Sequence, residues 1–130
     1  MSRTFEATPA RVWQALTSDS ELREWYWPRS LDPTIAVDLR VDGAYRFASV
    51  PAEMAVSGRY LEIVPPSRLV SSWQWDGEDE VSTVTIELAG VGADRTEVTV
   101  THTGLGPDEI ESHEQGWSDC LNRLPAHLKS

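Results

Sequence analysis

The C-terminal stretch 107–128 constrains the fold more than any other part of the sequence. Placed on a helical wheel at about 100° per residue, its large apolar side chains fall in one stripe, which predicts a long amphipathic helix. Pro107 suits the first helical position, where a missing N–H costs nothing. Such a stripe needs an apolar surface to pack against, and the middle of the chain is rich in short β-patterned runs, so we expect the helix to lie on a sheet. The stripe consists of Ile110, Trp117, Leu121, Leu124 and Leu128.

Two short helices are predicted near the start of the chain, after a short opening strand at 3–7. Thr8 is a suitable N-cap, with a proline at the first helical position behind it. Ser18 and Glu21 then form the S-x-x-E pattern of a capping box and predict a second helix. This helix must end before Pro28.

From Ile35 the hydrophobic period changes from 3.6 to 2, which predicts a half-buried strand over 35–41. The pair Asp42-Gly43 is a strong hairpin signal. A two-residue turn would direct Tyr45 and Phe47 outward, so we expect a three-residue loop that keeps both rings inside.

Further strands are expected at 53–64, 69–75, 84–88 and 97–102, each bounded by turn residues. Gly58 is a candidate β-bulge in the first of them. Alternation places Trp73 and Trp75 on one face and directs His102 inward. The sequence predicts an α+β fold in which a curved antiparallel sheet of about six to seven strands wraps around the C-terminal helix, a helix-grip arrangement.

Length and composition exclude several classes of protein. The 130 residues fit a single domain, 1–130. Twenty-one acidic against eleven basic side chains give a net charge of −10, which disfavours nucleic acid as a partner. We find no leader sequence and no apolar run of about 18 residues, so we expect a cytoplasmic protein without a membrane span. Cys120 is the only cysteine, and we interpret it as a small core residue rather than a reactive thiol.

The ordered set of motifs resembles one family. The chain is similar to the START-like, or SRPBCC, superfamily with the Bet v 1 fold, and within it to the bacterial branch of the activator of heat-shock protein 90 ATPase homologue family. No single stretch is diagnostic, but their order is. They are ATPARVWQALTSDSELREWYWP at 7–28, DLRVDGAYRF at 38–47, SGRYLEIVPPSRLVSSWQW at 57–75, VTIEL at 84–88, TEVTVTHTGL at 96–105 and HEQGWSDCLNRLPAHL at 113–128.

The resemblance implies a cavity between the sheet and the last helix, suited to a small lipophilic molecule, without specifying that molecule. Two departures stand out. Asp42 occupies a position where the family usually has the first glycine of a Gly-Gly pair, which should alter only the turn. The opening strand is short, which would leave an exposed sheet edge where a second copy could pair.

The candidate ligand-binding residues are the large side chains expected between sheet and helix, together with two histidines. The alternative interpretation is that these rings only fill the core, each contributing about 1.5–3 kcal/mol by burial. The set is Trp25, Trp27, Phe47, Trp73, Trp75, His102, His113, Trp117, Leu121 and Leu124.

His102 and His113 are predicted to meet at one end of the cavity, with Glu114 nearby. These three residues are the weak candidates for catalysis, as an acid/base pair or as groups that orient a ligand. The alternative is a structural hydrogen bond that ties the loop 104–106 to the helix. A zinc site is disfavoured because the histidines lack i, i+4 spacing on one helix. No nucleophile elbow is present.

We therefore predict a non-enzymatic module that binds a small hydrophobic or aromatic molecule, without cofactor or metal, as a monomer or homodimer. The first alternative is an enzyme that uses the same cavity for acid/base chemistry of the cyclase or hydrolase kind. The second is a co-chaperone that stimulates a heat-shock protein 90 ATPase.

Overall fold

The computed structural model describes residues 1–129 and contains one seven-stranded sheet, three α-helices and a short 3₁₀ helix. In chain order the elements are β1 (Ser2–Phe5), α1 (Pro9–Thr17), α2 (Asp19–Trp25), the 3₁₀ helix η1 (Arg29–Leu31), β2 (Thr34–Val37), β3 (Ala44–Ser49), β4 (Met54–Val64), β5 (Arg68–Trp75), β6 (Ser82–Gly90), β7 (Thr96–Thr103) and α3 (Ile110–Leu128).

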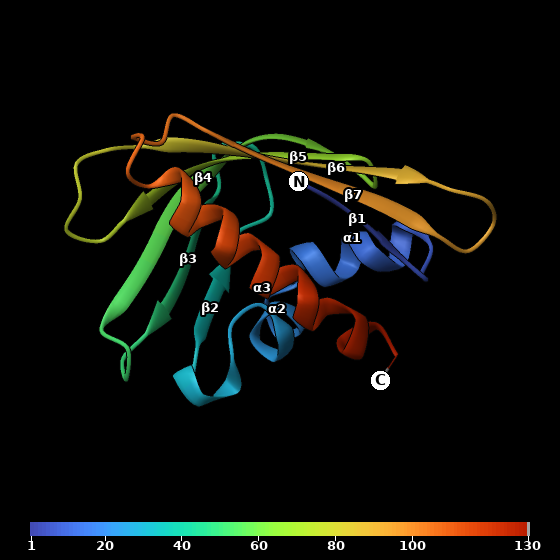
Figure 1. The fold of residues 1–130 in the computed structure, drawn as a ribbon, viewed down its shortest axis with the longest axis horizontal. Coiled ribbons are helices and arrows are strands. Elements are labelled where there is room, and N and C mark those ends of the chain that lie inside the picture. The colour runs from blue at the N-terminus through green and yellow to red at the C-terminus, as the bar shows by residue number, and fades with distance from the viewer. Residues whose placement is uncertain (130) are drawn as a thin grey trace.

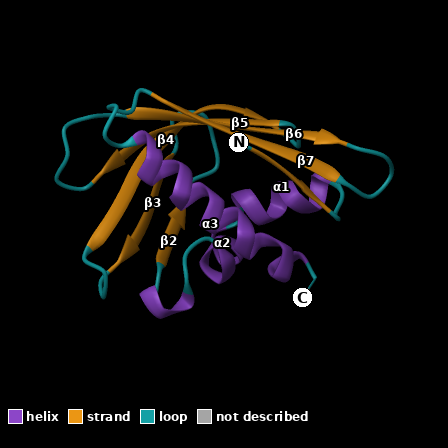
Figure 2. Cartoon of the chain, in the orientation of Figure 1, coloured by secondary structure: helices purple, strands orange, loops and turns teal. Residues whose placement is uncertain are grey.

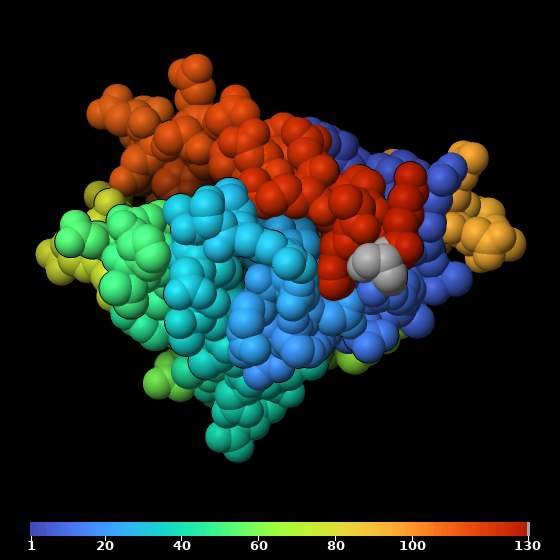
Figure 3. All heavy atoms as spheres, turned by 90° about the horizontal axis from the view of Figure 1, so that it is seen from below, coloured from blue at the N-terminus to red at the C-terminus, as the bar shows by residue number. Residues whose placement is uncertain are grey.

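The sheet confirms the predicted helix-grip arrangement. Its strands follow the order β1-β7-β6-β5-β4-β3-β2, and every neighbouring pair is antiparallel. The sheet curves around α3, and α1 and α2 lie on the same side of it (Figure 1; Figure 2). Seen from below, α3 crosses the molecule beside the segment that carries α2 and η1 (Figure 3). In residues 1–129, none of the helices is long and apolar enough to cross a bilayer.

The long helix α3 begins three residues later than predicted. Pro107 lies in a turn before the helix, and the backbone N–H of Gly106 donates to the Glu109 side chain at 3.4 Å. The apolar stripe is correct from Trp117 onward, but Ile110 is 47% exposed. It borders an open groove at the start of the helix, beside Met1 and other residues, instead of packing on the sheet.

The predicted cap of α1 is confirmed, and that of α2 is wrong. Thr8 accepts a hydrogen bond from the Arg11 backbone N–H, with proline at the first helical position. Ser18 makes no capping hydrogen bond with its side chain. Glu21 instead accepts a hydrogen bond from the Arg11 guanidinium at 2.6 Å and contacts His127 of α3 at 2.8 Å. An ion pair between helices has replaced the capping box.

The strand predicted over 35–41 ends early, at Val37. Residues 38–43 form a loop in which Asp42 has a φ of +67°, a left-handed conformation that asparagine, aspartate and glycine tolerate best. Gly43 is required there, because a Cβ would lie 2.1 Å from the carbonyl oxygen of Asp38. The expected three-residue loop was therefore too short, although Tyr45 and the ring two residues later are buried as predicted.

The bulge in β4 lies beyond the predicted position. Gly58 pairs regularly with Tyr45, and the register shifts between Tyr60 and Glu62. Gly58 instead allows the backbone of Ser72 in β5 to approach closely, since a Cβ at position 58 would lie 2.0 Å from the carbonyl oxygen of Ser72.

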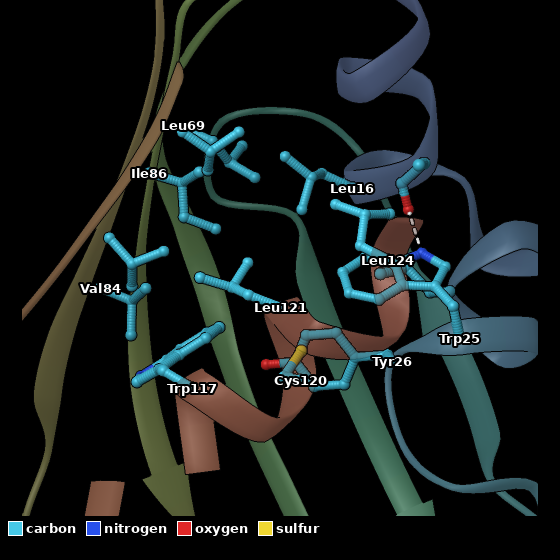
Figure 4. Packing of buried hydrophobic residues seen from close by; sticks show 14 of the residues in the cluster. Leu16, Trp25, Tyr26, Leu69, Val84, Ile86, Trp117, Cys120, Leu121 and Leu124 are labelled. Atoms are coloured by element: carbon cyan, nitrogen blue, oxygen red, sulfur yellow. Dashed lines mark hydrogen bonds between the residues drawn. The ribbon is translucent and has the colours of Figure 1, made fainter. Parts of the chain in front are cut away.

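The core lies between the concave face of the sheet and the three helices. Leu121 and Leu124 of α3 are almost completely buried. Leu121 lies towards the inward residues of β6, and Leu124 lies on the side of the short helices, near Leu16 (Figure 4). Alternation in β6 and β7 is as predicted, with Val84 and Val98 among the least exposed side chains. Arg123 of α3 donates to the backbone carbonyls at the end of α2, which satisfies groups that a helix terminus leaves without partners.

Alanine substitutions in the apolar stripe of α3 should destabilise the protein where the side chain is buried and have little effect where it is exposed. We expect Leu124→Ala to lower the free energy of unfolding by about 2–5 kcal/mol, since this fully buried side chain would leave a cavity. The matched control is Ile110→Ala, for which we expect a change within about 0.5 kcal/mol because the side chain is half-exposed. Urea unfolding monitored by tryptophan fluorescence measures both. Equal losses would show that the stripe packs along its whole length.

Candidate ligand-binding site

An aromatic pocket opens where the N-terminal half of α3 faces β5 and the segment after α2. Its volume is about 250 Å³, just below the usual range of about 300–1,000 Å³ for small-molecule pockets. Most of its wall is ring carbon. The outer compartment, as we call it, is lined by Tyr26, Trp27, Trp73, Trp75, Ser112, His113, Gly116, Trp117 and Cys120.

A second, inner compartment lies deeper between the sheet and the helices and measures about 40 Å³. This volume suffices for about one water molecule. Three rings border both compartments and form the partition between them: Tyr26, Trp73 and Trp117. Side chains thus fill most of the space between sheet and helix, and the larger open volume lies outside the partition.

The rings of the outer compartment are arranged in two orientations. Trp27 and Trp75 are parallel, with ring planes 4° apart and centroids 6.5 Å apart. Trp73 stands almost perpendicular to Trp75, at 87° and 5.5 Å. The edge-to-face contact is one that aromatic pairs prefer. The pocket therefore has flat walls that meet at nearly a right angle.

His102 is held in one neutral tautomer by its two partners. Its Nδ1 accepts a hydrogen bond from the Trp117 indole N–H at 3.1 Å, so the proton resides on Nε2, which donates to Ser82 Oγ at 2.7 Å. Burial, followed by the nearby ring of His113, lowers the pKa of His102 to about 4. Protonation of Nδ1 would also abolish the bond from Trp117.

His113 forms the corresponding pair with Trp75. Its Nε2 accepts a hydrogen bond from the Trp75 indole N–H at 3.0 Å, and its Nδ1 donates to the backbone carbonyl of Glu109 at 2.8 Å. The imidazole rings of His113 and His102 are 5.1 Å apart and nearly perpendicular. The two histidines meet as the sequence predicted, but neither binds the loop 104–106; each accepts from a tryptophan instead.

This arrangement limits what the histidines can do chemically. All four ring nitrogens are engaged, two as acceptors from indoles and two as donors. Neither His102 nor His113 has a free nitrogen with which to take a proton from a substrate. Among residues 1–129, no group of three or more histidine, cysteine or acidic side chains is placed to hold a metal ion.

The remaining predicted site residues fall in different places. Phe47 lines the inner compartment, and Glu114 borders the groove beside His102. Trp25 is 2% exposed and its indole N–H donates to the carbonyl of Ala15 in α1, so it ties the two short helices together away from both compartments. Leu121 and Leu124 belong to the packed core behind the partition.

Sequence reasoning missed Tyr26, Ser112, Gly116 and Cys120. Tyr26 lies between two tryptophans in the sequence, and its ring contacts Trp117 and Phe47, at centroid distances of 6.1 and 4.8 Å (Figure 4). Burial raises the pKa of the Tyr26 hydroxyl well above its ordinary value, and that of the Cys120 thiol to about 12. The run Trp25–Trp27 was the available signal. Three consecutive aromatic side chains at the end of a short helix point in different directions, so they cannot all pack against the same surface.

The fold and the pocket together define a START-like protein of the helix-grip class. The family model described as activator of Hsp90 ATPase homolog 1-like protein matches residues 6–129. The chain therefore belongs to this family. No curated protein sequence matches it.

Solved structures agree with this classification. A protein of Chromobacterium violaceum is 29% identical, with a TM-score of 0.86, and the match covers 100% of this chain and 96% of that one. CalU16 from Micromonospora echinospora is 27% identical over 98% of this chain and 73% of that one, with a TM-score of 0.77. An HSP90 activator from Plasmodium falciparum shares the fold, at 23% identity and a TM-score of 0.82, over 99% of this chain and 94% of that one.

The depressed pKa of His102 predicts an acid-sensitive contribution to stability. The unfolded chain takes up this proton near pH 6.5, whereas the folded protein does so only near pH 4. The contribution is thus fully present above pH 6.5 and is lost as the pH falls towards 4. We expect His102→Asn, whose amide oxygen can still accept from Trp117, to reduce the loss of stability over this interval. Urea unfolding at several pH values measures the difference; identical pH profiles for the two proteins would contradict the assignment.

Proposed function

We propose that this protein binds a small apolar, largely aromatic molecule in the outer compartment. The observation that carries the proposal is a pocket of about 250 Å³ walled by five aromatic rings and left open by the packing of α3. Rings that served only as core would be expected to pack together without such a space, because protein interiors are close-packed. The inner compartment meets that expectation, and the outer one does not.

Gly116 supports this interpretation. A glycine inside a helix costs roughly 1 kcal/mol relative to alanine, and such a cost is commonly offset by a close contact that only glycine permits. Here a Cβ would meet no atom within 4 Å, so no packing contact requires the glycine. Gly116 lines the outer compartment, and its missing side chain keeps that side of the pocket clear.

The alternatives receive less support. An enzyme that uses His102 or His113 as an acid or base would first have to break the bond to Trp117 or Trp75. The Plasmodium HSP90 activator is similar to this chain in fold only, so a co-chaperone role stays an alternative. A cytoplasmic location and a monomeric or homodimeric state stay predictions.

Substitution of Gly116 should block the pocket without harming the helix. We expect Gly116→Leu to weaken binding of the neutral probe N-phenylnaphthylamine at least about tenfold, equivalent to about 1.4 kcal/mol, because the leucine fills the open space. Gly116→Ala is the matched control, with binding close to wild type and stability raised by up to about 1 kcal/mol. Probe fluorescence and urea unfolding provide the two readouts.

Leucine and alanine are both better helix formers than glycine. If Gly116→Leu loses binding while Gly116→Ala keeps it, the loss is therefore not caused by a damaged helix. A leucine variant that binds the probe as tightly as wild type would place the binding site elsewhere. A wild-type protein that binds no apolar probe would refute the proposed function.

A further inference from the structure

We infer that the ligand is an uncharged, flat ring system that carries a hydrogen-bond acceptor, and that this acceptor binds the indole N–H of Trp73. The inference rests on the proposed function and specifies the class of molecule that the outer compartment selects. Three independent features of the wall carry it: ring geometry, charge and one donor without a partner.

The ring geometry favours a flat molecule. The ring planes of Trp27 and Trp75 are parallel, and the ring of Trp73 stands almost perpendicular to that of Trp75. A planar ring can stack on the first pair while presenting its edge to the third, the two arrangements that aromatic groups prefer. A saturated ring system of the same size would bury similar apolar area but would lack these contacts. The absent side chain of Gly116 leaves space for the ring on the α3 side.

The charge of the wall favours a neutral molecule. The nine residues that line the outer compartment include no lysine, arginine, aspartate or glutamate, and the Nε2 atom of His113 is occupied by the hydrogen bond from Trp75. A charged ligand would lose its hydration without gaining a partner of opposite charge. The net charge of −10 further disfavours an anion. A quaternary cation could contact ring faces, but it would offer nothing to an N–H donor.

The donor without a partner favours an acceptor on the ligand. Four indole N–H groups belong to rings of this pocket wall. Those of Trp75 and Trp117 are accepted by histidines. Of the other two, only the Nε1 atom of Trp73 is buried without a hydrogen-bond partner, and it is the one such side-chain polar atom in residues 1–129. Unsatisfied buried donors are rare and costly, so this group calls for an acceptor that the protein itself does not provide. The nitrogen is shielded from solvent in this structure, so the Trp73 ring has to turn towards the outer compartment for a ligand to reach it. A ring carbonyl of the ligand would be such an acceptor.

A matched set of ligands tests the inference on the wild-type protein. Fluorenone is flat, neutral and carries a carbonyl; fluorene lacks the acceptor; dicyclohexyl ketone keeps the carbonyl without flat rings. Two further fluorenones carry a carboxylate or a trimethylammonium group. We expect fluorenone to bind most tightly, with about a two- to tenfold preference over fluorene for one hydrogen bond. Dissociation constants come from quenching of tryptophan fluorescence.

Trp73→Phe separates the hydrogen bond from the apolar contacts. We expect this variant to bind fluorene and fluorenone equally, because phenylalanine keeps a ring but has no donor. Should the variant fold poorly, ¹⁵N-labelled indole spectra of the wild type give a second measurement. Fluorenone, but not fluorene, should then shift the Trp73 indole N–H resonance, with smaller changes at Trp75 and Trp117.

The outcomes distinguish this inference from the proposed function. If dicyclohexyl ketone or a charged fluorenone binds as tightly as fluorenone, or if fluorene equals fluorenone, the inferred ligand class is wrong, while apolar binding in the pocket stands. If none of the five compounds binds, the proposed function itself fails. A fluorenone affinity unchanged by Gly116→Leu would show that the compound binds outside the outer compartment.

Discussion

The seating of α3 on the concave sheet is the contact on which the rest of the structure depends. Leu121 packs towards β6 and Leu124 towards the short helices (Figure 4), and Trp117, one turn before Leu121, completes the core and forms part of the partition. Arg3 of β1 and Arg123 fix the polar sides of the helix, the former through Ser118 and the latter through the end of α2. The N-terminal half of the helix is thereby held at a distance from β5 that leaves an aromatic pocket.

The two tryptophan–histidine pairs explain how polar groups are tolerated beside that pocket. Each imidazole accepts a hydrogen bond from one indole through one ring nitrogen and donates through the other, so all four ring nitrogens have partners. This makes His102 and His113 elements that position Trp117 and Trp75, the rings of the wall. The indole N–H of Trp73 has no such partner, and this contrast with Trp75 and Trp117 is what directs attention to a ligand.

Periodicity predicted those parts of the fold in which a long run of residues shares one face. The stripe from Trp117 to Leu124, the alternation in β6 and β7 and the inward position of His102 follow from it directly. It failed where a long-range contact decides local structure. Glu21 pairs with Arg11 and His127 instead of capping its own helix. Strand β2 stops at Val37, and the loop 38–43 that follows is bonded through Asp42 and Gly43 to the backbone of Tyr60 in β4. No pattern of spacing contains those contacts.

The candidate site was predictable as a collection of rings but not as a shape. Sequence placed Trp73 and Trp75 together, yet it included Trp25, which bonds to Ala15, and it overlooked Gly116, whose role is the side chain it lacks. Native mass spectrometry of freshly purified protein, compared with the mass after denaturation, tests the central claim most directly. The account predicts a reproducible additional mass that denaturation removes and that the Gly116→Leu variant does not carry. A bare wild-type protein that also fails to take up neutral aromatic compounds would contradict it.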